Sequence, residues 1–192
     1  MRIRLPEVQA NSIGAPPSIV SELRTGDNDR QTFTLTTRQG VQREICIDSD
    51  VTLGIIKPDA TTRGLEDAIY SRIEGLGFDV IVLARRRLIQ EDIDFLYHAH
   101  IGKPYYPEIV AFMTSTEVEI FLVTGKDVVS KLNQIVGFTD PSKAQTNTIR
   151  GDLYAKDRVM PQFPNIYQNS IHSSSSDRVR DELAYFLRLI LS

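Results

Sequence analysis

The chain of 192 residues contains a single cysteine, Cys46, and no tryptophan. One cysteine excludes an internal disulfide and any metal site built from several thiolates. No apolar run approaches the roughly 18 residues that a membrane-spanning helix needs, and the first residues lack the apolar stretch of a secretory signal. These absences predict a globular protein of a reducing compartment, which we expect in the cytoplasm without a membrane partner.

An excess of basic residues is missing as well. The 22 lysines and arginines against 25 aspartates and glutamates give a net charge of −3 and a pI of about 5.6. This balance disfavours a nucleic-acid partner, because nucleic-acid-binding proteins ordinarily carry a basic surface. We interpret the basic run Arg85–Arg87 as the solvated end of a strand.

The length fits one domain with an appendage. Two segments near the start, Thr32–Thr36 and Val41–Ile47, alternate in hydrophobicity on either side of a short loop that contains Gly40. Such a pattern predicts a β-hairpin. We therefore divide the chain into an N-terminal extension with a hairpin, residues 1–49, and a main domain, residues 50–192.

From Asp50 onward the hydrophobic pattern predicts alternating strands and helices. Apolar runs typical of strands cover residues 51–57, 78–88, 117–123 and 170–171. Helical spacing covers residues 65–76, 91–98, 107–113, 127–136 and 179–190. Without the two short helices at 91–98 and 107–113, the order is β-α-β-β-α-β and a final helix, as in the ferredoxin-like (split βαβ) plan. We predict an α+β fold, an antiparallel sheet with helices on one face, and an irregular stretch from 137 to 167.

Two basic residues stand at positions where chemistry is possible. Lys57 follows the first strand of the main domain, and Pro58 fixes the turn behind it. A lysine at a strand end is usually solvated, so this feature alone is weak. Arg150 lies in the segment Thr148–Asp152, where it could form a surface ion pair or present a guanidinium to phosphate oxygens.

The three histidines are not equally good candidates for a functional role. His172 follows a short strand among serines, where most histidines are structural, although a neutral imidazole is also a competent nucleophile near neutral pH. His98 and His100 are two residues apart, so they do not share a helix face. We interpret both as surface or supporting residues, not as metal ligands.

In combination, these features are far more specific than each is alone. They occur in a fixed order: IIKPDA with RG, Tyr97, GKPYYP, G-x-T-x-P from Gly137, TIRGD and finally N-x-I-H. This set resembles the nucleoside diphosphate kinase family, and the resemblance extends from Val51 to Leu187. Residues 1–49 lie outside it.

The resemblance implies transfer of the γ-phosphate of a nucleoside triphosphate to a nucleoside diphosphate through a phosphohistidine, with ping-pong kinetics. It implies His172 as nucleophile, Lys57 and Tyr97 as further catalytic residues, and Glu182 as the carboxylate that orients the imidazole. This role for Glu182 requires that one residue be deleted between His172 and the last helix. The residues that would bind the nucleotide are Lys57, Tyr105, Thr139, Arg150, Asn169 and Ser174. The implied partners are ATP, GTP and other nucleotides, Mg²⁺ carried on their phosphates with no protein metal site, and further copies of the chain in a dimer or larger homo-oligomer.

Three departures from the family pattern leave an alternative open. Asn133 stands where the family usually has a second phosphate-binding arginine, and Ser173 and Ser175 replace a glycine and an acidic residue. The segment 153–168 is longer than is typical of the family. The alternative is a nucleotide-binding scaffolding or regulatory module with weak or no phosphotransfer. The retained set that favours the enzyme is Lys57, Tyr97, Arg150, Asn169 and His172.

Overall fold

The computed structural model describes residues 24–25, 31–46, 50–154 and 159–191. A three-stranded antiparallel sheet near the N-terminus contains β1 (Arg24–Thr25), β2 (Gln31–Thr36) and β3 (Gln42–Cys46). The hairpin β2–β3 confirms the sequence prediction, whereas β1 was not predicted. Two residues are too few to show a hydrophobic period.

The main sheet has four strands, and every neighbouring pair is antiparallel. Its strands are β4 (Val51–Ile56), β5 (Asp79–Arg87), β6 (Glu117–Thr124) and β7 (Ile171–Ser173), in the order β5-β6-β4-β7. β4 lies between β6 and β7, and all six of its residues are buried. The predicted α+β ferredoxin-like arrangement is confirmed.

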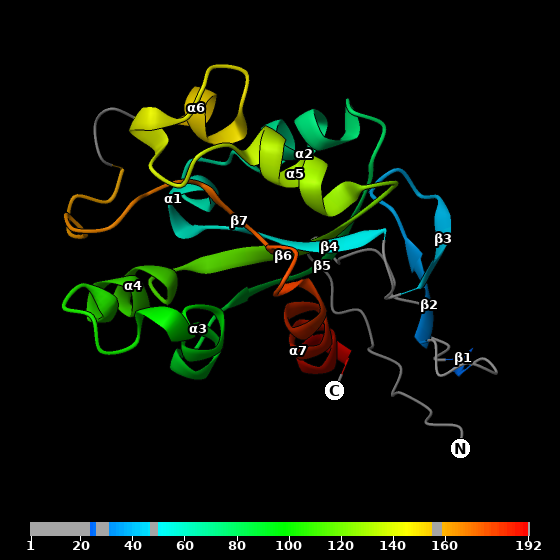
Figure 1. The fold of residues 1–192 in the computed structure, drawn as a ribbon, viewed down its shortest axis with the longest axis horizontal. Helices are drawn as coiled ribbons and strands as arrows, with labels where there is room; N and C mark the ends of the chain where they lie inside the picture. The colour runs from blue at the N-terminus through cyan, green and yellow to red at the C-terminus, as the bar shows by residue number, and fades with distance from the viewer. Residues whose placement is uncertain (1–23, 26–30, 47–49, 155–158, 192) are drawn as a thin grey trace.

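Helices cover both faces of this sheet (Figure 1). One layer holds α1 (Pro58–Thr61), α2 (Glu66–Glu74), α5 (Val128–Val136) and α6 (Ile149–Leu153), with the 3₁₀ turn η2 (Pro141–Lys143). The other holds α3 (Gln90–Leu96), α4 (Tyr106–Met113) and α7 (Val179–Leu191), with the 3₁₀ turn η1 (His98–His100). None of the helices that the structure describes is long and apolar enough to cross a membrane.

The prediction that helices pack on one face was therefore wrong. It left the short helices α3 and α4 out of the layer count, and it put the final helix, α7, on the same face as α2 and α5. The central strand shows the physical reason for two layers. Leu53 and Ile55 enter one apolar core with α3, α4 and α7, while Ile56 enters the other with α2 and α5. The irregular stretch predicted from 137 to 167 was also wrong, since it contains η2 and α6. A helix of five residues is too short to show a 3.6-residue period.

The N-terminal hairpin packs against β5 and α2. Leu35 is buried in the core beneath the sheet. The backbone N–H of Arg38 donates to the carbonyl of Val80, and its guanidinium pairs with Asp67 at 2.5 Å and Glu74 at 3.2 Å. The described part of the extension is therefore docked onto the main domain.

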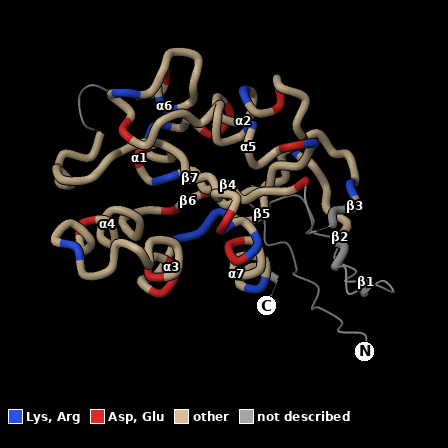
Figure 2. Tube along the Cα trace, viewed as in Figure 1, with Lys and Arg blue, Asp and Glu red and all other residues tan. Residues whose placement is uncertain are grey.

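Charged residues of both signs are interspersed over both helical layers (Figure 2). The basic run Arg85–Arg87 lies at the end of β5. Arg85 pairs with Glu66 at 3.2 Å and with Glu117 at 3.3 Å, and it is about half exposed. Neighbouring carboxylates thus offset part of the charge of this run, which fits a solvated strand end.

Gly54 marks a close approach within the central sheet. A Cβ at this position would lie 2.2 Å from the Cζ of Phe121. We expect Gly54→Ala to lower the free energy of unfolding by about 1–3 kcal/mol, because the buried ring must move. Urea unfolding measures this loss. With Phe121→Leu in the same chain, the combined loss should be smaller than the sum of the two single losses; simple additivity would contradict the clash.

Candidate active site

The strand β7 carries His172 at its centre, opposite Ile55 of β4. The imidazole Nε2 lies 2.8 Å from Oε2 of Glu182, which stands in the first turn of α7. Because an ionised carboxylate only accepts hydrogen bonds, this contact assigns the hydrogen to Nε2. Within the described residues no hydrogen bond reaches Nδ1, so the lone pair of this nitrogen is available to a reacting group.

Glu182 is buried, with 2% of its surface exposed. Its Oε2 also accepts a hydrogen bond of 2.6 Å from the hydroxyl of Ser174. Burial would raise the pKa of this carboxyl, but hydrogen bonds from His172 and Ser174 outweigh burial and hold the pKa below its usual range. The structure therefore brings three of the predicted site residues into one charged, hydrogen-bonded group.

Lys57 lies between β4 and α1 and is only 7% exposed, unlike the usual solvated lysine at a strand end. Its Nζ donates to Oδ1 of Asn169 at 2.7 Å. Burial and the neighbouring charge of Arg150 lower the pKa of Lys57 to about 7. A cation that has lost its water in this way is stabilised when an anionic group binds beside it.

Arg150, in α6, holds two backbone segments together. Its guanidinium donates to the carbonyls of Gly137 and Ile171, both at 2.9 Å, and its buried Nε has no hydrogen-bond partner among the described residues. Burial lowers the pKa of this arginine. Asn169 completes the same junction, since its Nδ2 donates to the backbone carbonyl of Thr139 at 2.8 Å, while the Thr139 side chain is exposed.

Aromatic rings line the side of the site formed by α3 and η1. The ring of Tyr97 lies edge-on to His172 with centroids 6.3 Å apart, and Nζ of Lys57 lies 5.8 Å from its centroid. Burial raises the pKa of Tyr97, so its hydroxyl stays protonated. Tyr105 is exposed and lies outside the hydrogen-bonded group. It connects to Tyr97 through His100, whose Nδ1 is 3.1 Å from the Tyr105 hydroxyl.

Sequence reasoning missed the pairing of Asp59 with Ser170. Ser170 has a left-handed backbone, with φ of 65°, just before β7. Its N–H donates to Oδ2 of Asp59 at 2.9 Å, and Asp59 is 1% exposed. The acid two residues after Lys57 was visible in the sequence, but its partner lies 111 positions away. Only the fold brings the two together.

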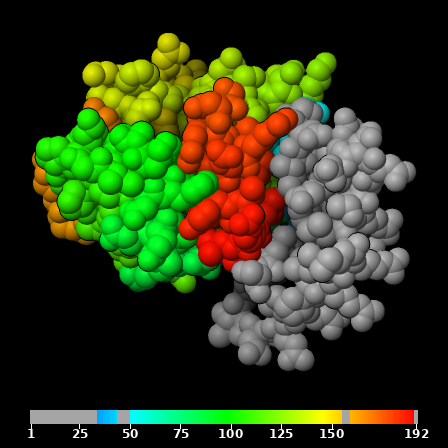
Figure 3. All heavy atoms as spheres, turned by 60° about the horizontal axis from the view of Figure 1, so that its bottom comes forward, coloured from blue at the N-terminus to red at the C-terminus, as the bar shows by residue number. Residues whose placement is uncertain are grey.

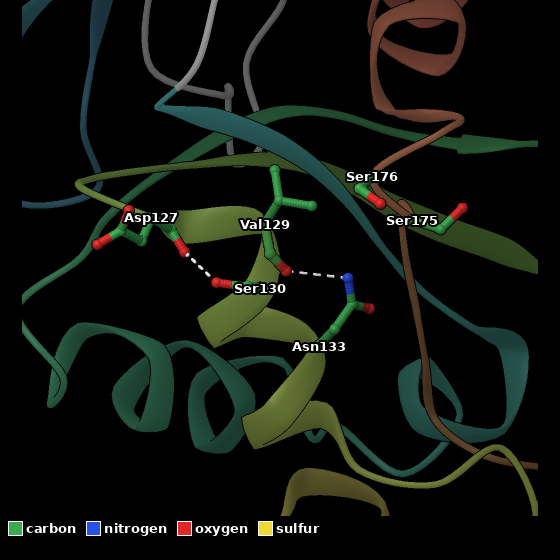
Figure 4. Close-up of a pocket in the computed structure, with 6 residues that line it drawn as sticks. All are labelled: Asp127, Val129, Ser130, Asn133, Ser175 and Ser176. Carbon is green, nitrogen blue, oxygen red and sulfur yellow. Dashed lines mark hydrogen bonds between the residues drawn. The ribbon is translucent and has the colours of Figure 1, made fainter.

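Asn133, in α5, also has a role that the sequence did not reveal. Its Nδ2 donates to the carbonyl of Ser174 at 2.9 Å, and its Oδ1 accepts a hydrogen bond of 2.7 Å from the hydroxyl of Ser173. Figure 4 shows this amide, which also donates to the carbonyl of Val129. The residues drawn there line a hollow of about 360 Å³ that contains none of the predicted catalytic residues. Asn133 thus ties the segment after His172 to α5 and supplies no charge.

In the described part of the structure, these contacts leave a histidine with one nitrogen held by a buried carboxylate and the other without a hydrogen bond, near two cations whose burial has removed their water. Neutral imidazole is a nucleophile, and desolvated cations favour phosphate oxygens. The class of protein that this fold and site favour is therefore a phosphotransferase.

Comparison with known proteins specifies the class further. The family profile described as nucleoside diphosphate kinase matches residues 50–189. The nucleoside diphosphate kinase of Wolbachia pipientis from Culex pipiens is 37% identical over 136 residues, covering 70% of this chain and 91% of that protein. The enzyme of Helicobacter pylori is 36% identical, covering 70% and 93%. This chain belongs to the nucleoside diphosphate kinase family, as the motifs indicated.

Solved structures agree with this assignment. The nucleoside diphosphate kinase of Halobacterium salinarum, solved in complex with CDP, superposes with a TM-score of 0.63 at 29% identity, covering 72% of this chain and 87% of that one. The Aquifex aeolicus enzyme gives a TM-score of 0.62 at 28% identity, covering 74% and 99%. The likeness in both cases extends over most of the other chain.

Proposed function

We propose that this protein is an active nucleoside diphosphate kinase whose nucleophile is Nδ1 of His172. The observation that carries the proposal is the 2.8 Å contact between Nε2 of His172 and the buried carboxylate of Glu182. This contact selects the tautomer in which Nδ1 holds a lone pair. The substrates are nucleoside triphosphates and diphosphates, ATP and GTP among them.

In the first half-reaction the Nδ1 lone pair attacks the γ-phosphorus of the triphosphate. A nitrogen–phosphorus bond forms, the bond from the γ-phosphorus to the bridging oxygen breaks, and the diphosphate leaves with that electron pair. The Nε2 hydrogen stays on the ring, directed at Glu182. In the second half-reaction a terminal oxygen of another diphosphate attacks the phosphohistidine and restores the neutral imidazole.

The remaining site residues bind and orient the nucleotide in this proposal. Lys57 and Arg150 neutralise phosphate charge that builds up in the transition state. Within the described part of the chain, Nη1 and Nη2 of Arg150 each donate once to a backbone carbonyl, so a second N–H on each nitrogen remains for a phosphate. Asn169 and Lys57 hold the ribose, Thr139 contacts a phosphate, and the exposed Tyr105 ring stacks on the base, a contact that tolerates every base.

Ser174 and Tyr97 support His172 in different ways. The Ser174 hydroxyl fixes the Glu182 carboxylate that orients the imidazole. The ring of Tyr97, whose hydroxyl stays protonated, covers the side of His172 that faces α3 and helps to keep water from the reacting nitrogen.

Mg²⁺ is part of the proposal as a complex with the nucleotide phosphates. Two cations, Lys57 and Arg150, lie near His172, and they fit a phosphate chain better than a bare metal ion. The nearby carboxylates of Glu182 and Asp59 already accept hydrogen bonds from His172, Ser174 and Ser170. When bound, Mg²⁺ would offset phosphate charge and align the chain of phosphates. Lys57 and Arg150 would bind the oxygens that the ion leaves free.

The proposal also covers the organisation of the protein. We place the catalytic unit in residues 50–192 and treat residues 1–49 as an extension. The proposal includes a homo-oligomer because the family resemblance implies one. Single exposed apolar side chains such as Leu76 and Phe138, at 57% and 61% exposure, are ordinary on a monomer and add no support. A cytoplasmic location is supported by the sequence, in which the single Cys46 leaves no internal disulfide to form.

The alternative function, a nucleotide-binding module with weak phosphotransfer, is favoured by one observation. Asn133 uses its amide to hold Ser173 and Ser174, so no arginine charge is present at this position. Losing one charged hydrogen bond costs about 1.5–3 kcal/mol. Such a loss weakens phosphate binding without removing the nucleophile, which is why we prefer the enzyme.

Labelling with γ-labelled ATP and Mg²⁺ tests the proposal. We expect a label on the chain that is lost in acid but stable in base, as a phosphoramidate should be, and that passes to added GDP or CDP. Peptide mapping should place it on His172. An acid-stable label, or a label that no diphosphate removes, would contradict the kinase and favour the binding module.

A further inference from the structure

Arg178 lies between two elements that the proposed mechanism treats separately. It directly precedes α7, and α7 packs beside the segment that holds α3 and α4 (Figure 3). The guanidinium donates to the carbonyl of Phe95 at 3.0 Å and lies over the Phe95 ring, 5.1 Å from its centroid. Arg178 therefore fastens the start of α7 to the last turn of α3.

The same guanidinium faces the carboxylate that orients the nucleophile. Nε of Arg178 lies 3.8 Å from Oε1 of Glu182, while Oε2 of the same carboxylate receives His172 and Ser174. The two oxygens thus have separate partners. One faces a fixed cation and the other is directed at the imidazole, which limits rotation of the carboxyl group.

We propose that Arg178 is a positioning residue of the phosphoryl-transfer site, acting on His172 through Glu182 and tying both to the Tyr97 side of the site. Tyr97 stands two residues after Phe95, whose carbonyl Arg178 holds. The proposal rests on the proposed function for its kinetic consequence. Its structural part, the fixed orientation of the Glu182 carboxylate, does not depend on turnover.

The surroundings of Arg178 support this assignment over a surface ion pair. The arginine side chain is 23% exposed and the Glu182 side chain 3%, so water screens the contact only in part. Asp181 lies 3.9 Å away but is 68% exposed, and is a weaker competitor for the guanidinium. The Phe95 ring also stacks on the ring of Tyr185, with the two centroids 4.1 Å apart, so both Arg178 and Tyr185 hold it in place.

Arg178→Gln in the full-length chain tests the proposal. Glutamine keeps a donor for the Phe95 carbonyl but removes the charge that faces Glu182. We expect kcat for transfer from ATP to a diphosphate to fall about five- to tenfold with KM unchanged, the size of one partly screened charged contact. Arg178→Lys, which keeps the charge without the planar fork, should give an intermediate kcat.

Arg180→Gln is the matched control, because Arg180 is exposed on the same helix two residues further on. It should retain the wild-type kcat, and the thermal midpoint of each variant should be measured so that the assays use folded protein. Wild-type kcat in Arg178→Gln, or a loss confined to KM or shared equally by Arg180→Gln, would show the proposal to be wrong.

A second readout does not depend on turnover. In ¹⁵N spectra of the imidazoles, wild-type His172 should show mainly the tautomer protonated at Nε2, and Arg178→Gln should lower that population. If the wild-type chain transfers no phosphate, the proposed function fails while this tautomer change still decides the role of Arg178. An unchanged tautomer population would overturn the positioning role.

Discussion

Replacing His172 by alanine is expected to lower kcat for phosphoryl transfer by at least about a thousandfold and to abolish labelling from γ-labelled ATP. The loss is large because both half-reactions pass through the nitrogen–phosphorus bond. Without the His172 imidazole this covalent route has no nucleophile. Steady-state transfer from ATP to a second diphosphate measures the first effect, and acid-labile label on the chain measures the second.

The fold must survive this substitution for the result to be informative. Alanine leaves the buried carboxylate of Glu182 without its strongest partner, so His172→Gln, which retains a hydrogen-bond donor, serves as a second variant. His98→Ala is the matched control, since His98 is exposed and belongs to neither the carboxylate pair nor the aromatic contacts of Tyr97. Substantial turnover in both His172 variants would assign the chemistry to another residue.

Lys57→Met is expected to lower kcat about a hundredfold. The substitution keeps the length and apolar stem of the side chain but removes a buried cation next to the reacting phosphate, and each charged hydrogen bond lost costs about 1.5–3 kcal/mol. Lys103→Met is a suitable control because Lys103 is exposed. Binding of nucleotide should be measured separately, so that a loss of kcat is distinguished from a loss of affinity.

The pH dependence of the wild-type protein gives Lys57 a second, independent signature. Because burial and Arg150 lower the pKa of Lys57 to about 7, the free protein loses this charge as the pH rises through about 7. The value of kcat/KM reports the free protein, so it should fall over that range, while kcat at saturating nucleotide should fall only at higher pH. This alkaline limb should vanish in Lys57→Met. Its persistence would mean that a different group titrates there.

The elements of the main sheet could be predicted from the sequence because their patterns are long enough to be periodic. β4, β5 and β6 were each expected to within a few residues, as were α2, α5 and α7. The two-sided helical cover was not predicted, since a helical pattern does not say which face of the sheet the helix covers and a strand buried on both faces shows no alternation. The placement of short elements depends on tertiary contacts that a local window does not contain.

In the candidate site too, local motifs could be predicted from the sequence, whereas contacts between distant residues could not. Lys57, Arg150 and His172 could be singled out from ordered motifs, and the structure brings them to one place. The burial of Lys57 could not be foreseen, because a lysine after a strand is ordinarily solvated and its partner Asn169 is 112 positions away. The sequence did not indicate a role for Arg178, because its partner Phe95 is also distant along the chain. Arg178 lies four residues before Glu182, a spacing that in the sequence indicates only an ordinary ion pair along a helix. The contact with the Phe95 carbonyl of α3 depends on the fold.

The left-handed backbone of Ser170 gives the N-x-I-H spacing a geometric meaning. In a regular strand, side chains three positions apart point to opposite faces of the sheet. Asn169 and His172 are three apart, yet Nζ of Lys57 binds one and lies over the Tyr97 ring that borders the other. The turn at Ser170, at about 1–2 kcal/mol for a residue with a Cβ, reverses the parity of the chain between them. With the present spacing of three, a straight backbone at Ser170 would turn the Asn169 amide to the face of the sheet opposite His172.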